Sequence, residues 1–417
     1  MIQKKIINLI VLALFINGCE KIEFSIQEIV SSTGVYDAPV VNSNDVLERA
    51  YQMATMEWVP LNPIPKCNGG YYETGRKVKG APYSSVKEIS TYLFQDVSYY
   101  TFMTAIHNPS SVIYTEDISK TPYHGGNCAP YYGSVCSSSI MWVLGISIPY
   151  STGQIIEQPF MEKLEYQVID SLKVCDVLWK KGHVQMVYDI VHQADTLFSI
   201  SLFEQSDNSA HIRSYSKKSF QKIWNDGRYE AYRYKFIYYS DHRSTYNGFP
   251  PIDYNDDLCP SKGDQAVYRT DDSITINIFN QVFSDIVLTM DGETVSVDKF
   301  EGMSHQYTNL TPGIYYAYLQ AGDQKSKSVS FEVVGIDVNF SFSDSDTIVI
   351  HFSSTAKADF AVLCQRDGSS LLQFPISDED RNRGYVVVPA WDFPEYYCKV
   401  VFCGKYGRII NTPLRVN

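Results

Sequence analysis

Three residues in the first half of the chain, Cys136, His183 and Glu204, have the types and the order that a cysteine nucleophile requires. A thiol attacks a carbonyl carbon as a thiolate, so it needs a neighbouring base and donors for the oxyanion that forms. Cys136 precedes three serines and an apolar run closed by Gly145, a pattern that predicts a short helix beginning near the cysteine. At a helix start, the dipole and the free backbone N–H groups stabilise both a thiolate and an oxyanion.

The histidine and the glutamate fall on two consecutive predicted strands. His183 follows the Lys181-Gly182 turn, and the next strand, residues 197–204, ends on Glu204, the one acid in an apolar segment. A carboxylate there can accept the second imidazole N–H and fix the tautomer of the base. We therefore expect the thiol as nucleophile, His183 as base and Glu204 as the residue that orients His183, with Gln205 as the alternative for the third role.

Two segments around these residues resemble the motifs of the NlpC-type cysteine peptidases. Residues 122–145 read Pro-Tyr-His-Gly-Gly, then Tyr-Gly-Ser-Val-Cys-Ser-Ser-Ser-Ile-Met-Trp-Val-Leu-Gly, and are similar to the family's Pro-Tyr-x-Trp-Gly-Gly and Asp-Cys-Ser-Gly. Residues 172–187 read Leu-Lys-Val-Cys-Asp-Val-Leu-Trp-Lys-Lys-Gly-His-Val-Gln-Met-Val and resemble Leu-x-x-Gly-Asp-Leu and Gly-His-Val-Gly-Ile. The resemblance covers roughly residues 80–240. It implies a circularly permuted papain-like fold with Cys136 as nucleophile and His183 as base.

The sequence departs from that family close to the thiol. Val135 replaces the usual Asp before the nucleophile, Ser138 replaces a Gly, and Cys175 replaces the Gly before Asp176. The third polar position falls on Glu204, where the family more often has His, Asn or Gln. These differences indicate a divergent branch with an altered substrate pocket.

Two tyrosines are candidates for substrate binding near the thiolate. Tyr123 matches the tyrosine of the family motif, and Tyr83 is its rival; a structural role is the alternative for both. His107, His192 and His211 have no motif context, and we expect them to be ordinary loop or surface residues.

The N-terminus has the pattern of a secretory signal peptide: two lysines, an apolar run over residues 6–16, and Asn17-Gly18-Cys19. The run is shorter than the ~20 apolar residues that span a bilayer. Residues 15–19 resemble the lipobox of bacterial lipoproteins, which implies cleavage before Cys19 and lipid on that cysteine. We expect an exported protein that is lipid-anchored in the bacterial cell envelope, at the outer membrane. Plain signal cleavage, which leaves a soluble secreted protein, is the alternative.

The charge and the cysteine spacing limit the classes of partner and cofactor that we expect. The formal net charge of −12 without basic clusters argues against nucleic-acid binding. The nine cysteines show no metal-ligand spacing, so neither a metal nor an organic cofactor is implied. Disulfide pairing cannot be deduced from these spacings.

From about residue 270 onward, short alternating strands with turn signals between them predict two small immunoglobulin-like β-sandwich modules, or one larger β-domain. The expected fold class is α+β, a papain-like domain followed by these all-β modules. Within the first domain, helices are expected at about 44–56, 85–93 and 99–106. The expected organisation is a signal peptide (1–18), a tether (19–40), the catalytic domain (41–240), a linker (241–269) and two β-modules (270–335 and 336–417).

The resemblance implies a hydrolase that cleaves amide bonds in peptidoglycan stem peptides, or an amidase acting on another peptide. The β-modules would position it against the wall or a glycan. A catalytically inactive surface binding or scaffold lipoprotein is the alternative of a different class, and the altered residues around Cys136 favour it.

Overall fold

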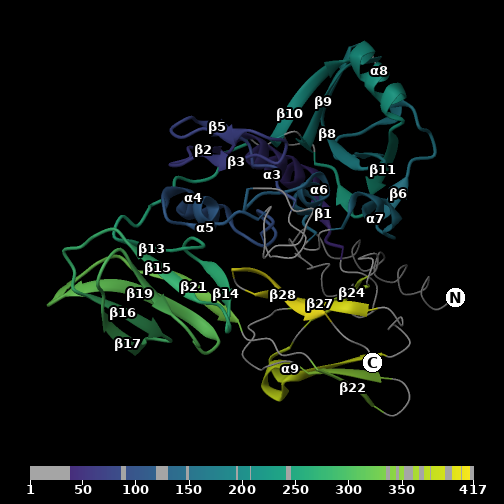
Figure 1. The fold of residues 1–417 in the computed structure, drawn as a ribbon. Coiled ribbons are helices and arrows are strands. Elements are labelled where there is room, and N and C mark those ends of the chain that lie inside the picture. Colours follow the sequence, from purple (N-terminus) through teal and green to yellow (C-terminus); the bar gives the residue numbers. More distant parts are fainter. Residues whose placement is uncertain are drawn as a thin grey trace, which may run out of the picture. The chain divides into compact units, whose positions relative to one another are not determined.

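The structure is a computed structural model (Figure 1). It describes residues 38–85, 91–118, 130–146, 150–193, 196–206, 208–240 and 246–334, and the shorter segments 339–343, 347–351, 360–365, 371–375, 377–389, 397–404 and 406–413. The signal peptide, Cys19, most of the expected tether and Tyr123 lie outside these residues.

The first domain is built on one antiparallel six-stranded sheet with the order β10-β9-β8-β7-β11-β6. Its strands are β6 (Met161–Lys163), β7 (Val177–Lys180), β8 (His183–Gln193), β9 (Thr196–Ser206), β10 (Ser209–Ser216) and β11 (Glu230–Tyr234).

Both faces of this sheet are covered, because successive side chains of a strand point to opposite sides. On β8, Val184 and Met186 join one core with α3 (Ser43–Thr55) and α6 (Cys136–Val143). Val187 joins a second core with Phe220 and Trp224 of α8 (Lys217–Gly227), which lies beside β9 and β10 in Figure 1. The sheet is therefore sandwiched between the helix that begins with Cys136 and helix α8.

The remaining elements of this domain are short. They are β1 (Val41–Asn42) paired with β12 (Ile237–Tyr238), β2 (Glu57–Trp58) with β5 (Val78–Lys79), β3 (Ile64–Pro65) with β4 (Tyr71–Tyr72), helices α4 (Tyr99–His107), α5 (Val112–Thr115) and α7 (Thr152–Glu157), and a 3₁₀ turn (Ile169–Ser171).

Of the helices expected at about 44–56, 85–93 and 99–106, two are present. The first is α3, where the Asn42 side chain accepts a hydrogen bond from the Asn44 N–H, and another is α4, capped by Ser98. The helix expected over 85–93 is wrong where the structure describes it: Tyr92 and Leu93 form isolated bridges with Gly133 and Val97. Long-range backbone pairing overrides the local helical pattern there.

The first β-module is a sandwich of two sheets. One contains β13 (Leu258–Pro260), β15 (Ile274–Ile278) and β18 (Ser304–Tyr307); the other contains β14 (Ala266–Arg269), β21 (Val329–Val334), β19 (Gly313–Ala321), β16 (Asp285–Met290) and β17 (Glu293–Lys299), with β20 (Gln324–Lys325) on β19. Ile276, Leu288 and Phe331 share one core that joins both sheets. The expected linker 241–269 is corrected here, because residues 258–260 and 266–269 supply β13 and β14 to the sandwich.

A second set of two sheets follows. One contains β22 (Asn339–Ser343), β23 (Thr347–His351) and β26 (Tyr385–Pro389); the other contains β25 (Leu371–Pro375), β24 (Phe360–Gln365), β27 (Tyr397–Gly404) and β28 (Gly407–Pro413). Helix α9 (Asp378–Arg383) precedes β26. The chain is thus an α+β domain followed by β-sandwich architecture.

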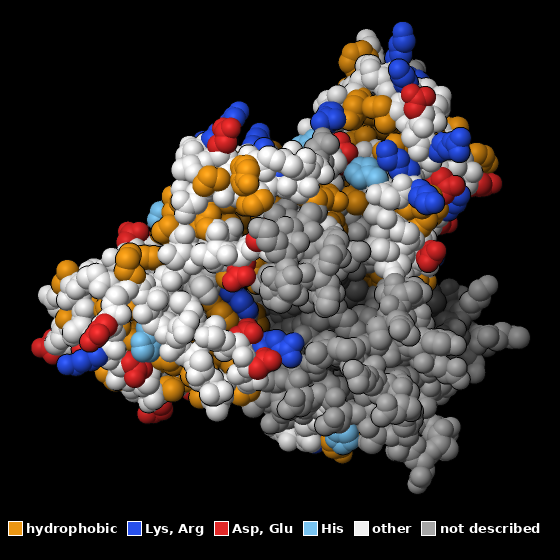
Figure 2. Space-filling view, viewed as in Figure 1, with side chains coloured by type: hydrophobic (Ala, Val, Ile, Leu, Met, Phe, Trp, Pro, Cys, Tyr) orange, Lys and Arg blue, Asp and Glu red, His pale blue; other side chains and the backbone are white. Residues whose placement is uncertain are grey.

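On the face of the molecule shown in Figure 2, acidic and basic side chains are interspersed over the described surface. In the parts of the chain that the structure describes, no helix combines the length and the apolar character needed to cross a bilayer.

Candidate active site

Helix α6 begins at Cys136 because the residues around it close the preceding turn. Val135 is extended, its N–H donates to Ser138 Oγ at 2.9 Å, and Ser139 Oγ donates to the Val135 carbonyl at 2.8 Å. Ser138, which departs from the family's glycine, thus has a capping role. Cys136 is the first helical residue, is not in a disulfide and has 6% of its surface exposed. Its own N–H is one of the amides that have no partner within a helix, so it is available to an oxyanion.

A neighbouring segment fixes the approach to this helix. The Ser84 N–H donates to the Ser134 carbonyl at 3.1 Å, and Tyr83 forms a parallel bridge with Ser134. Gly133 is needed there, since a Cβ at that position would lie 2.6 Å from the backbone oxygen of Pro82. The chain therefore enters α6 through a strand-like contact at Gly133 that leaves no space for a side chain.

This contact brings Tyr83 close to Cys136. Burial raises the pKa of Tyr83, and the proximity of Cys136 raises it further. Of the two tyrosines expected near the thiolate, the structure places Tyr83 there, whereas Tyr123 falls outside the residues it describes.

His183 is the first residue of β8, directly after Gly182 with its positive φ of 83°. Its Nε2 lies 3.2 Å from Glu204 Oε2, with 18% and 9% of the two side chains exposed. Because a carboxylate only accepts, Nε2 carries the proton, and Nδ1 is left for the thiol. Burial lowers the pKa of His183, but hydrogen bonds with Cys136 and Glu204 outweigh it and raise the pKa to about 9.

The pairing of β8 with β9 explains why Glu204, and not Gln205, faces His183. Neighbouring residues of a strand point to opposite faces. Gln205 points to the other face, where its Nε2 donates to the Ala81 carbonyl at 3.1 Å in a fully buried position. The expected grouping of Cys136, His183 and Glu204 is therefore present in the structure.

His211 is a residue of this site that sequence reasoning missed. It was expected in a loop or at the surface, but it lies on β10 directly opposite Glu204, with its Nε2 3.0 Å from Glu204 Oε1 and 24% of its side chain exposed. The available signal was the short connection between β9 and β10, since counting outward from it pairs 204 with 211. His192 and His107 are exposed, as expected.

Glu204 is thereby held as a carboxylate. Burial raises its pKa, but the hydrogen bonds from His183 and His211 outweigh burial and hold the pKa of Glu204 well below its usual range. The bond with Glu204 also raises the pKa of His211, against the effect of burial.

The motif around Asp176 shapes the entry to β7. Asp176 is fully buried and accepts two hydrogen bonds from Arg233, at 2.7 and 2.8 Å, and one from the Lys173 N–H. Cys175, which stands where the family has glycine, adopts a positive φ of 68°, the conformation that glycine favours. Burial raises the pKa of the Cys175 thiol, whose Sγ lies 3.8 Å from the Ser43 carbonyl oxygen.

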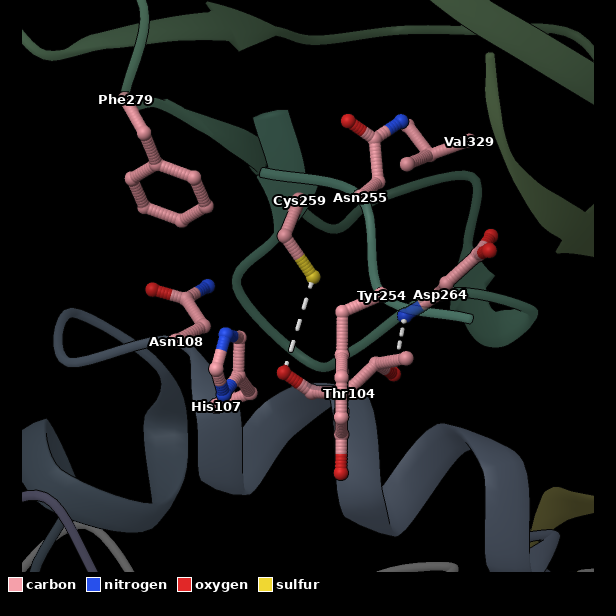
Figure 3. Close-up of a pocket in the computed structure, with 9 residues that line it drawn as sticks. All are labelled: Thr104, His107, Asn108, Tyr254, Asn255, Cys259, Asp264, Phe279 and Val329. Carbon is pink, nitrogen blue, oxygen red and sulfur yellow. Dashed lines mark hydrogen bonds between the residues drawn. The ribbon is translucent and has the colours of Figure 1, made fainter. Parts of the chain in front are cut away.

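A small pocket lies away from these residues, between α4 and the first β-module (Figure 3). In it, Cys259 Sγ lies 3.9 Å from the Thr104 carbonyl, and the Asp264 N–H donates to Thr104 Oγ1 at 2.9 Å. Burial raises the pKa of Cys259, so its thiol is protonated at neutral pH. The described residues include no group of three or more His, Cys, Asp or Glu side chains arranged to hold a metal ion.

Comparisons with known proteins add little. No protein-family model and no curated protein matches the sequence. Similar solved structures include a segment of two fibronectin type III domains from chicken tenascin, at 12% identity over 38% of this chain and 95% of that chain, with a TM-score of 0.24. The CD2-binding domain of CD58 is similar at 12% identity over 37% of this chain and 97% of that chain, with a TM-score of 0.21. Likeness at this level carries no functional argument, so the NlpC-type resemblance rests on the sequence motifs.

Proposed function

We propose that this protein is a cysteine hydrolase that cleaves amide bonds. One observation carries the proposal: α6, β8 and β9 bring a thiol, an imidazole and a carboxylate into one hydrogen-bonded series, Cys136–His183–Glu204. Each side chain has the partner its role requires, and the thiol stands at a helix start where an oxyanion can be held.

The reaction follows from this geometry. Cys136 attacks the amide carbonyl as a thiolate paired with the His183 imidazolium, and the Cys136 N–H helps to hold the oxyanion. His183 Nδ1 then gives its proton to the leaving amine, which departs and leaves a thioester. Neutral His183 next takes a proton from water, whose oxygen attacks the thioester and releases the acid and the thiol. Throughout, Glu204 accepts from Nε2 and keeps Nδ1 directed at the sulfur.

Peptidoglycan stem peptides are the proposed substrate class. The resemblance of residues 122–145 and 172–187 to NlpC-type motifs supports it, together with the expected export and lipid attachment at Cys19. A hydrolase anchored in the envelope meets wall peptides before any cytosolic substrate. The β-modules are proposed to hold the enzyme against its polymer.

A second candidate is an inactive surface binding or scaffold lipoprotein. Two observations favour it: only 6% of Cys136 is exposed, and Val135 and Ser138 replace residues typical of the family. Thiol reactivity separates the two candidates. In the enzyme, iodoacetamide labels Cys136 far faster at neutral pH than the buried Cys259, with each peptide quantified by mass spectrometry. Equally slow labelling of both cysteines removes the enzyme and leaves the binder.

Digestion of purified peptidoglycan tests the substrate. The wild type is expected to release stem-peptide fragments, Cys136→Ser none, and Cys259→Ser, a change at a buried cysteine outside the site, as much as the wild type. A wild type with a reactive Cys136 that cuts no wall preparation contradicts the substrate class but not the hydrolase.

A further inference from the structure

The carboxylate of Glu204 lies between two imidazoles, not one. Its Oε2 faces His183 Nε2 at 3.2 Å, and its Oε1 faces His211 Nε2 at 3.0 Å. Each histidine has its own oxygen, so neither displaces the other. The order of groups across the sheet is therefore base, carboxylate and second imidazole, on β8, β9 and β10.

The second ring has an acceptor at each nitrogen. His211 Nδ1 lies 3.0 Å from the Ser209 carbonyl oxygen, and Nε2 faces the Glu204 carboxylate. A carbonyl and a carboxylate only accept hydrogen bonds, whereas a neutral imidazole has one N–H and one lone pair. A neutral His211 would therefore point a lone pair at an oxygen on one side. Both contacts are satisfied when the ring is an imidazolium.

We infer that His211 is a positioning residue that stays doubly protonated at neutral pH, holds Glu204 in place and balances its charge. This role rests on the proposed hydrolase function. Because both of its nitrogens are engaged, His211 does not exchange protons with the substrate and acts only through Glu204.

The positive charge of His211 affects how tightly His183 holds its proton. A lone carboxylate beside an imidazole favours its charged form, and a base that holds its proton too tightly cannot activate water for the second half of the reaction. A cation on the far side of Glu204 weakens that pull on His183. The imidazolium of His211 thus keeps the proton of His183 transferable while Glu204 still fixes the orientation of the ring.

The charges around His211 come from the sheet itself. Glu204 on β9 stabilises the protonated ring, and Arg213, two residues along β10, opposes it. Helices α3 and α8 also pack against β10, but none of their charged side chains is among the groups that influence His211 in the described structure. Glu204 is thus the partner that keeps the ring charged.

Nitrogen-15 NMR of the full chain with labelled histidine tests the charge state directly. The signals are assigned by comparison with His211→Gln and with His192→Gln, which removes an exposed histidine near the other end of β8. At pH 7.5, both ring nitrogens of His211 are expected at imidazolium shifts. One protonated and one unprotonated nitrogen overturns the inference, whatever the protein hydrolyses.

Alkylation of Cys136 by iodoacetate tests the effect on the base without any substrate. This anionic reagent reacts fastest beside an imidazolium, so its rate falls as His183 loses a proton. His211→Gln keeps a hydrogen-bond donor for Glu204 but removes the positive charge. The alkaline limb of the rate–pH profile, where alkylation slows, is expected to move to higher pH by about one unit. In the control His192→Gln this limb is expected to stay where it is in the wild type. Identical profiles in the wild type and His211→Gln contradict the charge-balancing role. A Cys136 that reacts no faster than Cys259 in the wild type contradicts the proposed hydrolase instead, and leaves the NMR result unaffected.

Discussion

His183 Nε2 lies 3.2 Å from Glu204 Oε2, although the two residues are 21 positions apart in the sequence. The long β8–β9 pair creates this contact, with Met186 opposite Phe203 in the register. The same pair contributes Val184, Met186 and Phe203 to the core beneath α6. The packing that stabilises the sheet thus also holds the His183 imidazole against the Glu204 carboxylate.

Glu204→Gln is expected to lower kcat by about tenfold or more while the fold is kept. His183 and His211 face different carboxylate oxygens, so in Glu204→Gln one of the two rings faces an NH2 group, which donates and cannot accept. The measurement is the turnover of a wall peptide together with a thermal melt. Glu230→Gln, which removes a carboxylate of β11 that pairs with Lys163 of β6, is the control and should leave kcat unchanged. Equal turnover in the wild type and Glu204→Gln would mean that another side chain orients His183.

The contact between Glu204 and His183 should make the stability of the fold fall both in acid and in base. The pKa of Glu204 is lowered on folding, so its contribution is present above the unfolded value of about 4.3 and is lost as the solution becomes more acidic. The pKa of His183 is raised on folding to about 9, so its contribution is complete below about pH 6.5 and is lost toward pH 9. The difference in Tm between the wild type and Glu204→Gln should therefore be largest between about pH 4.5 and 6.5. A difference that stays constant from pH 3 to 10 contradicts this linkage.

Local patterns identified the elements of the site but not every contact between them. The serines after Cys136 and the closing Gly145 predicted α6, and the alternation after Gly182 predicted β8. Tyr83 reaches the thiol through a bridge to Ser134, a pairing of distant segments that no local pattern contains.

Two expectations from the sequence were wrong because backbone pairing within the fold decides the structure of these segments. The helix expected over 85–93 is wrong where the structure describes it, because Tyr92 and Leu93 pair with Gly133 and Val97. The strands β13 and β14 were missed inside the expected linker because they are only 3 and 4 residues long, and their apolar residues form a pattern only beside β15 and β21.

Tyr83→Phe tests whether this tyrosine serves the substrate or the fold. If its hydroxyl binds the substrate near the thiol, kcat/KM should fall about tenfold, the value of one hydrogen bond of about 1.4 kcal/mol, with Tm unchanged. Tyr72→Phe is the matched control, because the Tyr72 hydroxyl donates to the backbone oxygen of Asn208 and its loss should lower Tm without lowering kcat. A Tyr83→Phe enzyme with full activity assigns Tyr83 a structural role.

Arg233→Met should destabilise the first domain by about 3–5 kcal/mol, because it leaves the buried carboxylate of Asp176 without its cation. Urea unfolding measures the change. The double variant Arg233→Met/Asp176→Asn should recover part of the loss, since the uncompensated charge is gone and the Lys173 N–H keeps an amide oxygen as its acceptor. Because Asp176 fixes the turn into β7, and β7 pairs Lys180 with His183, the single variant should also slow alkylation of Cys136 before it unfolds the protein. Additive losses in the double variant would mean that the two side chains contribute independently, and that the turn does not depend on their pairing.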